Sequence, residues 1–173
     1  MTAKVLKRLS KHFVSSVPLP DDEIARLQKT RLIGEGIRYR RQIFMSLLDL
    51  YLHSAAAAEA IHTAEDLFKI SSTMQREMTG LEPVPSTSFL ASWYHIAQGY
   101  DAGYYGYLWS EVLACDVYAC FEDSPEGCMN GQLGKKYRKT ILEPGAVKTG
   151  DVMLRDFLGR PPNDAAFMRR FNK

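Results

Sequence analysis

Apolar residues recur at helical spacing along most of the chain. Between residues 22 and 52 they stand three, four and seven positions apart, while charged and amide side chains occupy the other faces. The apolar set is Ile33, Ile37, Phe44, Leu47, Leu48, Tyr51 and Leu52, and the polar set is Glu35, Arg38, Arg41, Gln42 and Asp49. This pattern predicts one long amphipathic helix, or two helices joined near Gly34 and Gly36.

Shorter helices are predicted on both sides of this segment. The first has the apolar residues Leu6, Leu9, Phe13 and Val14, and Asp21 or Asp22 is expected to cap the next one after the turn SSVPLPDDE. A helix over residues 63–78 has the apolar side Leu67, Phe68, Ile70, Met74 and Met78. The proline-containing stretch TGLEPVPSTS then predicts a loop.

The stretch YLWSEVLACDVYACF is apolar on nearly every side, which predicts a helix enclosed by other protein. Its carboxylates, Glu111 and Asp116, need partners. Three more helices are predicted, in GQLGKKYRKTIL, KTGDVMLRDFLG and NDAAFMRRF, the last opened by an Asn or Asp cap. At most a short strand is expected around Phe89 to Ala91. The prediction is therefore an all-α, multi-helix region spanning residues 1–173.

Composition narrows the class of protein. With 173 residues, 46% apolar and 24% charged, the chain has the make-up of a globular domain, and a net charge of +2 implies neither nucleic acid nor a membrane as partner. No apolar run is long enough for a membrane span, and MTAKVLKRLSKHF lacks a signal-peptide core, so we expect a cytoplasmic location, with organellar targeting of a longer form left open. Cys115, Cys120 and Cys128 are expected to be free thiols.

No complete catalytic set is visible. The four histidines form no His-Glu-x-x-His motif, and His62 with Glu65 or Asp66 is a single pair without a third ligand, so no metal site is expected. The chain also lacks a Gly-x-Ser-x-Gly elbow, a cysteine beside a histidine and a phosphate-binding glycine loop.

The stretch HIAQGYDAGYYGYLW combines four tyrosines with three glycines. Neutral phenols can donate hydrogen bonds to a carbonyl or an oxyanion. If Asp101 caps a helix, Tyr104 and Tyr107 share one face while Tyr105 points elsewhere. The alternative is that these rings are ordinary core residues of a helix.

The longer string HIAQGYDAGYYGYLWSEV resembles the C-terminal signature of the thimet oligopeptidase and neurolysin family of zinc metallopeptidases, which includes oligopeptidase A and dipeptidyl carboxypeptidase. The strings IRYRRQIFMSLLDLYLH, GKKYRKTILEPG and MLRDFLGRPPNDAAF resemble further landmarks of that family in the same order. The resemblance covers residues 6–167, nearly the whole chain, and corresponds to about the C-terminal quarter of a full member.

This resemblance implies a set of roles. In the family, zinc is held by the two histidines of His-Glu-x-x-His and a later glutamate, all of which would precede Met1, so no residue of this chain is expected to bind metal. Tyr107 matches the tyrosine that stabilises the oxyanion, and His95, Tyr100 and Tyr104 match residues that bind the peptide substrate. Gly99, Gly103 and Gly106 would give flexibility to the substrate loop over residues 95–107.

The chain departs from the family pattern at two positions. Tyr94 stands where many members have a glycine, and Gln98 replaces another small residue. Closure of the loop or the width of the peptide channel is expected to differ as a result.

Two functions are compatible with these observations. The first is the C-terminal segment of a zinc-dependent metalloendopeptidase, inactive alone, whose partners are short peptides and the missing N-terminal part of the enzyme. The alternative is a non-catalytic helical module that binds peptides or regulates a full-length relative. An in-frame His-Glu-x-x-His upstream of Met1 would favour the first. An apolar face along residues 104–121 is expected to cause self-association or marginal stability.

Overall fold

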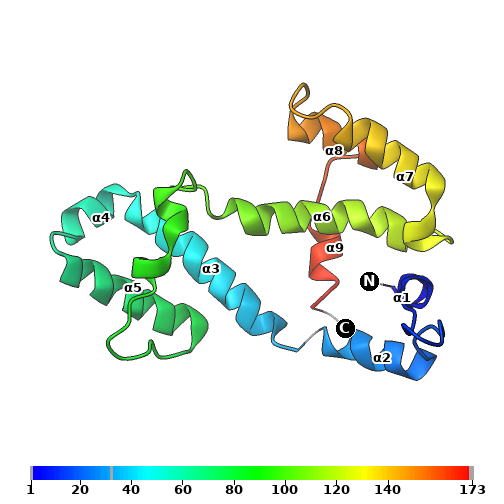
Figure 1. The fold of residues 1–173 in the computed structure, drawn as a ribbon. Helices are drawn as coiled ribbons and strands as arrows, with labels where there is room; N and C mark the ends of the chain where they lie inside the picture. Colours follow the sequence, from blue (N-terminus) through cyan, green and yellow to red (C-terminus); the bar gives the residue numbers. More distant parts are fainter. Residues whose placement is uncertain (1, 32, 172–173) are drawn as a thin grey trace. The chain divides into compact units, whose positions relative to one another are not determined.

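The computed structural model describes residues 2–31 and 33–171, and every regular element among them is helical (Figure 1). The prediction of an all-α fold is confirmed. The chain divides into two compact units, one of residues 34–109 and the other of residues 1–33 and 110–173. That residues 1–173 form one helical region of a larger catalytic domain stays a prediction.

The unit of residues 34–109 is built on two long helices that lie side by side, α3 (Glu35–Leu52) and α5 (Ala64–Thr79), with α4 (Ala55–Ala60) between them in sequence (Figure 1). Their shared core contains Phe44, Met45 and Leu48 of α3, with Met74 and Met78 of α5 packed against it. This pairing follows from the apolar stripes of both helices.

Local hydrogen bonds explain where α5 begins and ends. Thr63 and Asp66 form a capping box, in which the Thr63 hydroxyl accepts from the Asp66 N–H at 3.1 Å and the Asp66 carboxylate accepts from the Thr63 N–H at 3.0 Å. Gly80 follows the helix with φ of +73°, a conformation that glycine adopts without a steric penalty. Arg40 of α3 donates to the Met78 carbonyl at 2.6 Å, which ties α3 to the end of α5.

After α5 the chain forms two 3₁₀ turns, η1 (Leu90–Ser92) and η2 (Tyr94–Ala97), and then enters α6 (Gly106–Glu122). The short strand allowed for around Phe89 to Ala91 is not formed. The segment is a helical turn, in which the Ser92 and Trp93 N–H groups donate to the carbonyls of Phe89 and Leu90. The turn directs Phe89 and Trp93 into the core.

The other unit contains α1 (Ala3–Leu9), α2 (Asp21–Thr30), α7 (Gly131–Tyr137), α8 (Gly150–Leu158), α9 (Ala165–Met168) and most of α6. A 3₁₀ turn, η3 (Gly127–Met129), precedes α7. A π-helical turn, η4 (Arg138–Leu142), directly follows α7 and contacts α8. The rings of Phe121, Tyr137 and Phe157 form an aromatic core in this unit.

The two carboxylates of α6 that the sequence singled out, Glu111 and Asp116, have partners. Asp116, which is 1% exposed, accepts two hydrogen bonds from the Arg160 guanidinium, at 2.6 and 2.8 Å, and one from the Asn163 N–H at 2.9 Å. Glu111 pairs with Arg170 at 3.0 Å. The arginine and the asparagine from the GRPPN turn thus hold the chain after α8 against α6.

Several predicted helix boundaries are wrong. The first helix ends at Leu9, and Phe13 and Val14 lie outside it, 91% and 74% exposed. Helix α2 begins at Asp21 after Pro20 and has no side-chain cap, so neither aspartate caps it. Of the two alternatives for residues 22–52, the break is the observed one: α2 ends at Thr30, and Gly34, with φ of +78°, precedes α3.

The enclosure predicted for α6 is also not observed, since only Asp116 and Ala119 of this helix are buried. Apolar composition alone therefore overestimated its burial. Cys115, Cys120 and Cys128 are free thiols, as expected. Among the described residues, no helix is both long and apolar enough to span a membrane.

Candidate functional site

Three of the tyrosines and the histidine singled out in the sequence lie in one ring cluster. The His95 imidazole is at its centre, with its ring centroid 5.7 Å from Tyr100, 5.3 Å from Tyr104 and 5.9 Å from Tyr107. All three contacts are edge-to-face, an arrangement that aromatic rings favour. The structure thus brings together the four predicted site residues.

The backbone between His95 and Tyr107 is a series of turns. The His95 carbonyl accepts from the Tyr100 N–H at 3.2 Å, and the Tyr100 carbonyl accepts from the Gly103 N–H at 2.9 Å. Gly99 has φ of +84°, which allows the chain to reverse beside the histidine. Because α6 begins only at Gly106, the expectation that Asp101 caps a helix holding Tyr104 and Tyr107 is wrong.

The two rings nevertheless lie together, because Tyr107 donates its N–H to the Tyr104 carbonyl at 3.2 Å and their centroids are 4.9 Å apart. Tyr105 lies outside the cluster and is 48% exposed, as expected. The pairing predicted for a helix face is therefore produced by a turn instead.

Tyr107 stacks on Tyr100 with centroids 5.3 Å apart and an angle of 21° between the planes. A hydrogen bond to Tyr100 and partial desolvation raise the pKa of Tyr107 to about 12. Tyr107 is 42% exposed, and its phenol is protonated at neutral pH.

Tyr104 differs from the other two because it is only 5% exposed. It packs edge-to-face on Trp93, with centroids 5.1 Å apart, in the core of its unit. Burial raises the pKa of the Tyr104 phenol, against the opposing effects of the Gln42 side chain and the Arg41 charge. In this conformation of the loop, Tyr104 is a core residue.

One residue that the sequence placed on a polar helix face lies beneath this loop. Asp49 of α3 is fully buried, and its carboxylate accepts from the Ala102 N–H and the Tyr104 N–H, both at 2.9 Å. The Nδ1 atom of His53 lies 3.1 Å from the same carboxylate. The available signal was spacing, because Asp49 follows buried Met45 by one helical turn.

Three buried polar atoms around Tyr104 have no hydrogen-bond partner among the residues described: Gln42 Oε1, Trp93 Nε1 and His95 Nδ1. They comprise an amide acceptor, an indole donor and an imidazole nitrogen whose role depends on its tautomer. Buried polar atoms are usually paired, so unpaired ones call for an explanation.

The two positions that depart from the resembled pattern flank the histidine. Tyr94 stacks on His95 with centroids 4.3 Å apart and is itself 60% exposed. Gln98 donates its N–H to the His95 carbonyl at 3.2 Å. The bulky residue therefore covers one face of the imidazole.

No group of three or more histidine, cysteine, aspartate or glutamate side chains suited to a metal ion occurs in residues 2–31 and 33–171. Of the pair noted in the sequence, Asp66 is engaged at the start of α5, where its carboxylate also accepts from the His62 N–H at 3.2 Å. This carboxylate has a capping role.

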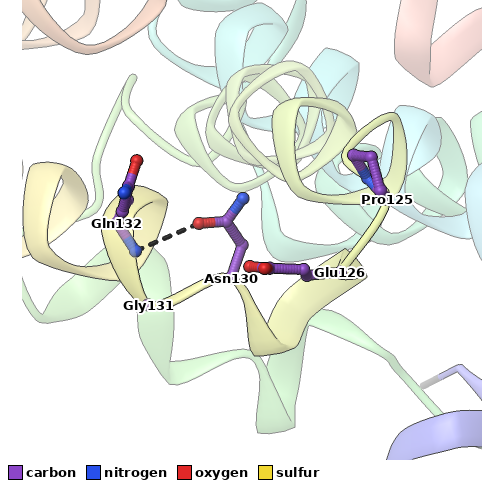
Figure 2. Close-up of a pocket in the computed structure, with 5 residues that line it drawn as sticks. All are labelled: Pro125, Glu126, Asn130, Gly131 and Gln132. Atoms are coloured by element: carbon purple, nitrogen blue, oxygen red, sulfur yellow. Dashed lines mark hydrogen bonds between the residues drawn. The ribbon is translucent and has the colours of Figure 1, made fainter.

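Figure 2 shows a pocket in the other unit, at the junction of η3 and α7, lined by Pro125, Glu126, Asn130, Gly131 and Gln132. The Asn130 side chain accepts from the Gln132 N–H at 3.0 Å and so caps α7 (Figure 2). None of the predicted site residues lines this pocket, and its polar side chain serves the helix end.

Comparison with known proteins finds similar sequences among oligopeptidases. The chain is 31% identical over 166 residues to "Thimet-like oligopeptidase" of Dictyostelium discoideum, a match covering 95% of this chain and 24% of the relative. Two proteins of Arabidopsis thaliana, "Probable cytosolic oligopeptidase A" and "Organellar oligopeptidase A, chloroplastic/mitochondrial", are each 30% identical over 167 residues, covering 95% of this chain and 23% and 21% of their own lengths. The chain spans about a quarter of the length of these relatives or slightly less.

Comparison with protein families gives a match along the whole sequence, residues 1–173, to the family described as "Peptidase family M3". The resemblance carried by the tyrosine-rich string and its companion landmarks is thereby confirmed. The chain belongs to peptidase family M3.

Proposed function

We propose that this chain supplies the peptide-binding and oxyanion-stabilising part of a zinc-dependent metalloendopeptidase that hydrolyses short peptides. The observation that carries the proposal is that the rings of His95, Tyr100 and Tyr107 contact one another. Two of these side chains offer phenol hydroxyls and the third an imidazole nitrogen, and all can hydrogen-bond a peptide without adding a fixed negative charge.

Tyr107 is the proposed catalytic donor. A peptide carbonyl becomes an oxyanion when water adds to it, and a donor directed at that oxygen stabilises the transition state more than the substrate. The pKa of Tyr107, raised to about 12, keeps the phenol protonated at neutral pH, and in the proposal its O–H turns from Tyr100 to the oxyanion when substrate is bound. Its partial exposure leaves it accessible to a substrate.

The remaining residues have proposed binding roles. His95 and Tyr100 hold peptide carbonyls near the bond to be cleaved, and Tyr104 binds the peptide backbone when the loop opens and releases its ring from the core. Gly99, Gly103 and Gly106 give the loop the freedom to make this movement.

Family M3 is zinc-dependent, whereas the described part of this chain offers no group of ligands for the metal. The residues do not fit a zinc site, and no step through zinc is assigned to them. In the proposal, the zinc ligands and the base that activates water belong to polypeptide outside this chain, so the chain alone does not hydrolyse peptides. The proposed location is cytoplasmic, which is the location that the name "Probable cytosolic oligopeptidase A" gives for the Arabidopsis relative.

A loop exchange tests the proposed roles. Residues 93–109 of this chain would replace the matching segment of the Dictyostelium relative, and hydrolysis of a quenched fluorescent peptide would be followed. We expect an active chimera in which Tyr107→Phe lowers kcat by about 10²–10³-fold, as the loss of an oxyanion donor does elsewhere. The matched control Tyr105→Phe, a change at an exposed ring, should leave kcat within about twofold.

An unchanged kcat in the Tyr107→Phe chimera would reject the catalytic role of Tyr107. The purified chain with added zinc, with and without a chelator, provides the second measurement. Chelator-sensitive cleavage would reject the proposal that the metal site lies elsewhere. If the purified chain binds peptide but the chimera that carries its loop is inactive, the alternative function is favoured, a non-catalytic peptide-binding or regulatory module.

A further inference from the structure

The loop that carries the ring cluster is held from below by one side chain. The Asp49 carboxylate, with no exposed surface, receives the N–H groups of Ala102 and Tyr104 at 2.9 Å each. These residues are 53 and 55 positions away in sequence, and they lie between Tyr100 and Tyr107 in the chain. A single carboxylate therefore fixes the part of the backbone that separates the two stacked phenols.

The local conformation needs such an anchor. Ala102 has φ of +53°, a region that residues with a side chain adopt rarely and at a cost in energy. A conformation of this kind persists where surrounding contacts determine it, and the bond from the Ala102 N–H to Asp49 is such a contact. Buried carboxylates are in turn stable only when donors surround them. Asp49 has its two backbone donors, and the Nδ1 atom of His53 lies 3.1 Å from its Oδ1 and 2.8 Å from its backbone carbonyl oxygen.

We propose that Asp49 is a positioning residue of the substrate loop, which sets the distance and stacking of Tyr100 and Tyr107 through the backbone of Ala102 and Tyr104. Its importance for peptide hydrolysis rests on the function proposed above. Asp49 itself touches no reacting atom. It acts by keeping the Tyr107 hydroxyl bonded to Tyr100.

The variant Asp49→Asn tests this inference, because it keeps the size of the side chain but turns an N–H donor toward one of the two backbone donors. We expect amide hydrogen exchange at Ala102 and Tyr104 to accelerate at least tenfold, while amides of the α5 core such as Ser71 keep their rates. The Tyr107 phenol should then titrate at lower pH than in the wild-type chain, since its bond to Tyr100 is loosened. Affinity for a short peptide should fall at least tenfold.

The matched control is Asp101→Asn, which makes the same chemical change one residue before Ala102, at an exposed carboxylate. It should alter none of these quantities. An Asp49→Asn chain that keeps the wild-type Tyr107 titration would overturn the inference. So would equal acceleration of exchange at Ala102 and throughout α5, because that result describes a residue needed only for the stability of the whole unit.

A measurement on the wild-type chain covers the case in which Asp49→Asn does not fold. In that chain the amide hydrogens of Ala102 and Tyr104, which bond the Asp49 carboxylate, should exchange at least tenfold more slowly than in an unstructured peptide of the same sequence, and NMR should show the rings of Tyr100 and Tyr107 in contact. Unprotected amides at Ala102 and Tyr104 beside stacked rings would overturn the inference. If the wild-type chain binds no peptide, the proposed function fails, whereas the exchange and titration results still decide the role of Asp49.

Discussion

The rings of Tyr100 and Tyr107 lie stacked, 5.3 Å apart between centroids, where the loop joins the first turn of α6. The hydrogen bond between them is the largest cause of the raised pKa of Tyr107, followed by desolvation. Tyr107 keeps its proton at neutral pH and donates its hydrogen bond to the Tyr100 oxygen, which orients the Tyr107 hydroxyl. This relationship leads directly to a spectroscopic prediction.

Tyr100→Phe should lower the pKa of Tyr107 from about 12 toward the ordinary tyrosine value of 10.0. The substitution keeps the stacked ring but removes the oxygen that stabilises the protonated form of Tyr107. Ultraviolet titration of phenolate absorbance measures the change. Tyr105→Phe, which leaves the stack intact, should preserve the titration near pH 12. If both variants titrate like the wild-type chain, the hydrogen bond is not the cause.

Arg160→Gln should destabilise the unit that contains α6 by roughly 2 kcal/mol, because it removes charge-assisted hydrogen bonds from a buried carboxylate, an effect reduced by the partial exposure of Arg160. Arg155→Gln is the matched control. It breaks an exposed pair with Asp151 and should cost less than about 0.5 kcal/mol. Urea unfolding at neutral pH compares the two, and equal losses would contradict the account.

The same pair predicts a pH dependence. The hydrogen bond from Arg160, and then that from Asn163, hold the pKa of Asp116 below its ordinary value of 3.8. A lowered folded-state pKa means that the stabilisation is complete above 3.8 and is lost as the pH falls through the lower folded value. The wild-type chain should therefore lose stability below pH 3.8, and Arg160→Gln should lose less over that interval. Parallel acid profiles for the two chains would refute this.

Two glycine substitutions should have opposite effects on stability. Gly159 ends α8 with φ of +72°, so Gly159→Ala should cost about 1 kcal/mol or more. Gly134 lies within α7, and an added methyl group there meets no atom within 4 Å, so Gly134→Ala should stabilise by about 0.5–1 kcal/mol. Thermal unfolding followed by circular dichroism measures both changes. Changes of the same sign would show that one of these conformations is wrongly assigned.

The purified chain should self-associate through the apolar residues at the start of α6. Trp109 is 64% exposed and Tyr105 48% exposed, and adjacent apolar surface of this kind promotes association. Sedimentation velocity should show a sedimentation coefficient that rises with concentration. Trp109→Gln should weaken this dependence, whereas Val147→Thr, at a 93% exposed residue outside residues 104–121, should not. A monodisperse, cooperatively unfolding wild-type monomer would count against the prediction.

The sequence predicts best those helices whose first and last turns contain capping residues. The α5 segment begins at the Thr63 cap and ends at Gly80, and both signals are visible in the residues themselves. Four residues that the sequence singled out, His95, Tyr100, Tyr104 and Tyr107, lie in one ring cluster. The break between α2 and α3 was only one of two alternatives in the sequence. A glycine such as Gly34 favours a break but is also tolerated inside a helix at a modest cost in stability.

Asp49 shows why the rest of the site could not be predicted. Helical periodicity assigned this residue to a polar face because it sorts residues by polarity alone. The structure buries it completely, since a loop more than 50 residues later brings two backbone N–H groups to its carboxylate. Likewise, the apolar string of α6 does not indicate which of its faces is covered. Such long-range pairings depend on tertiary structure.

In the proposed function, His95, Tyr100 and Tyr107 form the peptide-contacting surface of this chain. A titration of the isotope-labelled chain with a short peptide, monitored through the NMR signals of these three rings, tests this proposal. The account predicts saturable shifts at His95, Tyr100 and Tyr107, strongly reduced in Tyr107→Phe. Saturable binding that leaves these rings unmoved and instead shifts the residues around Asn130, or no binding at all, would contradict it.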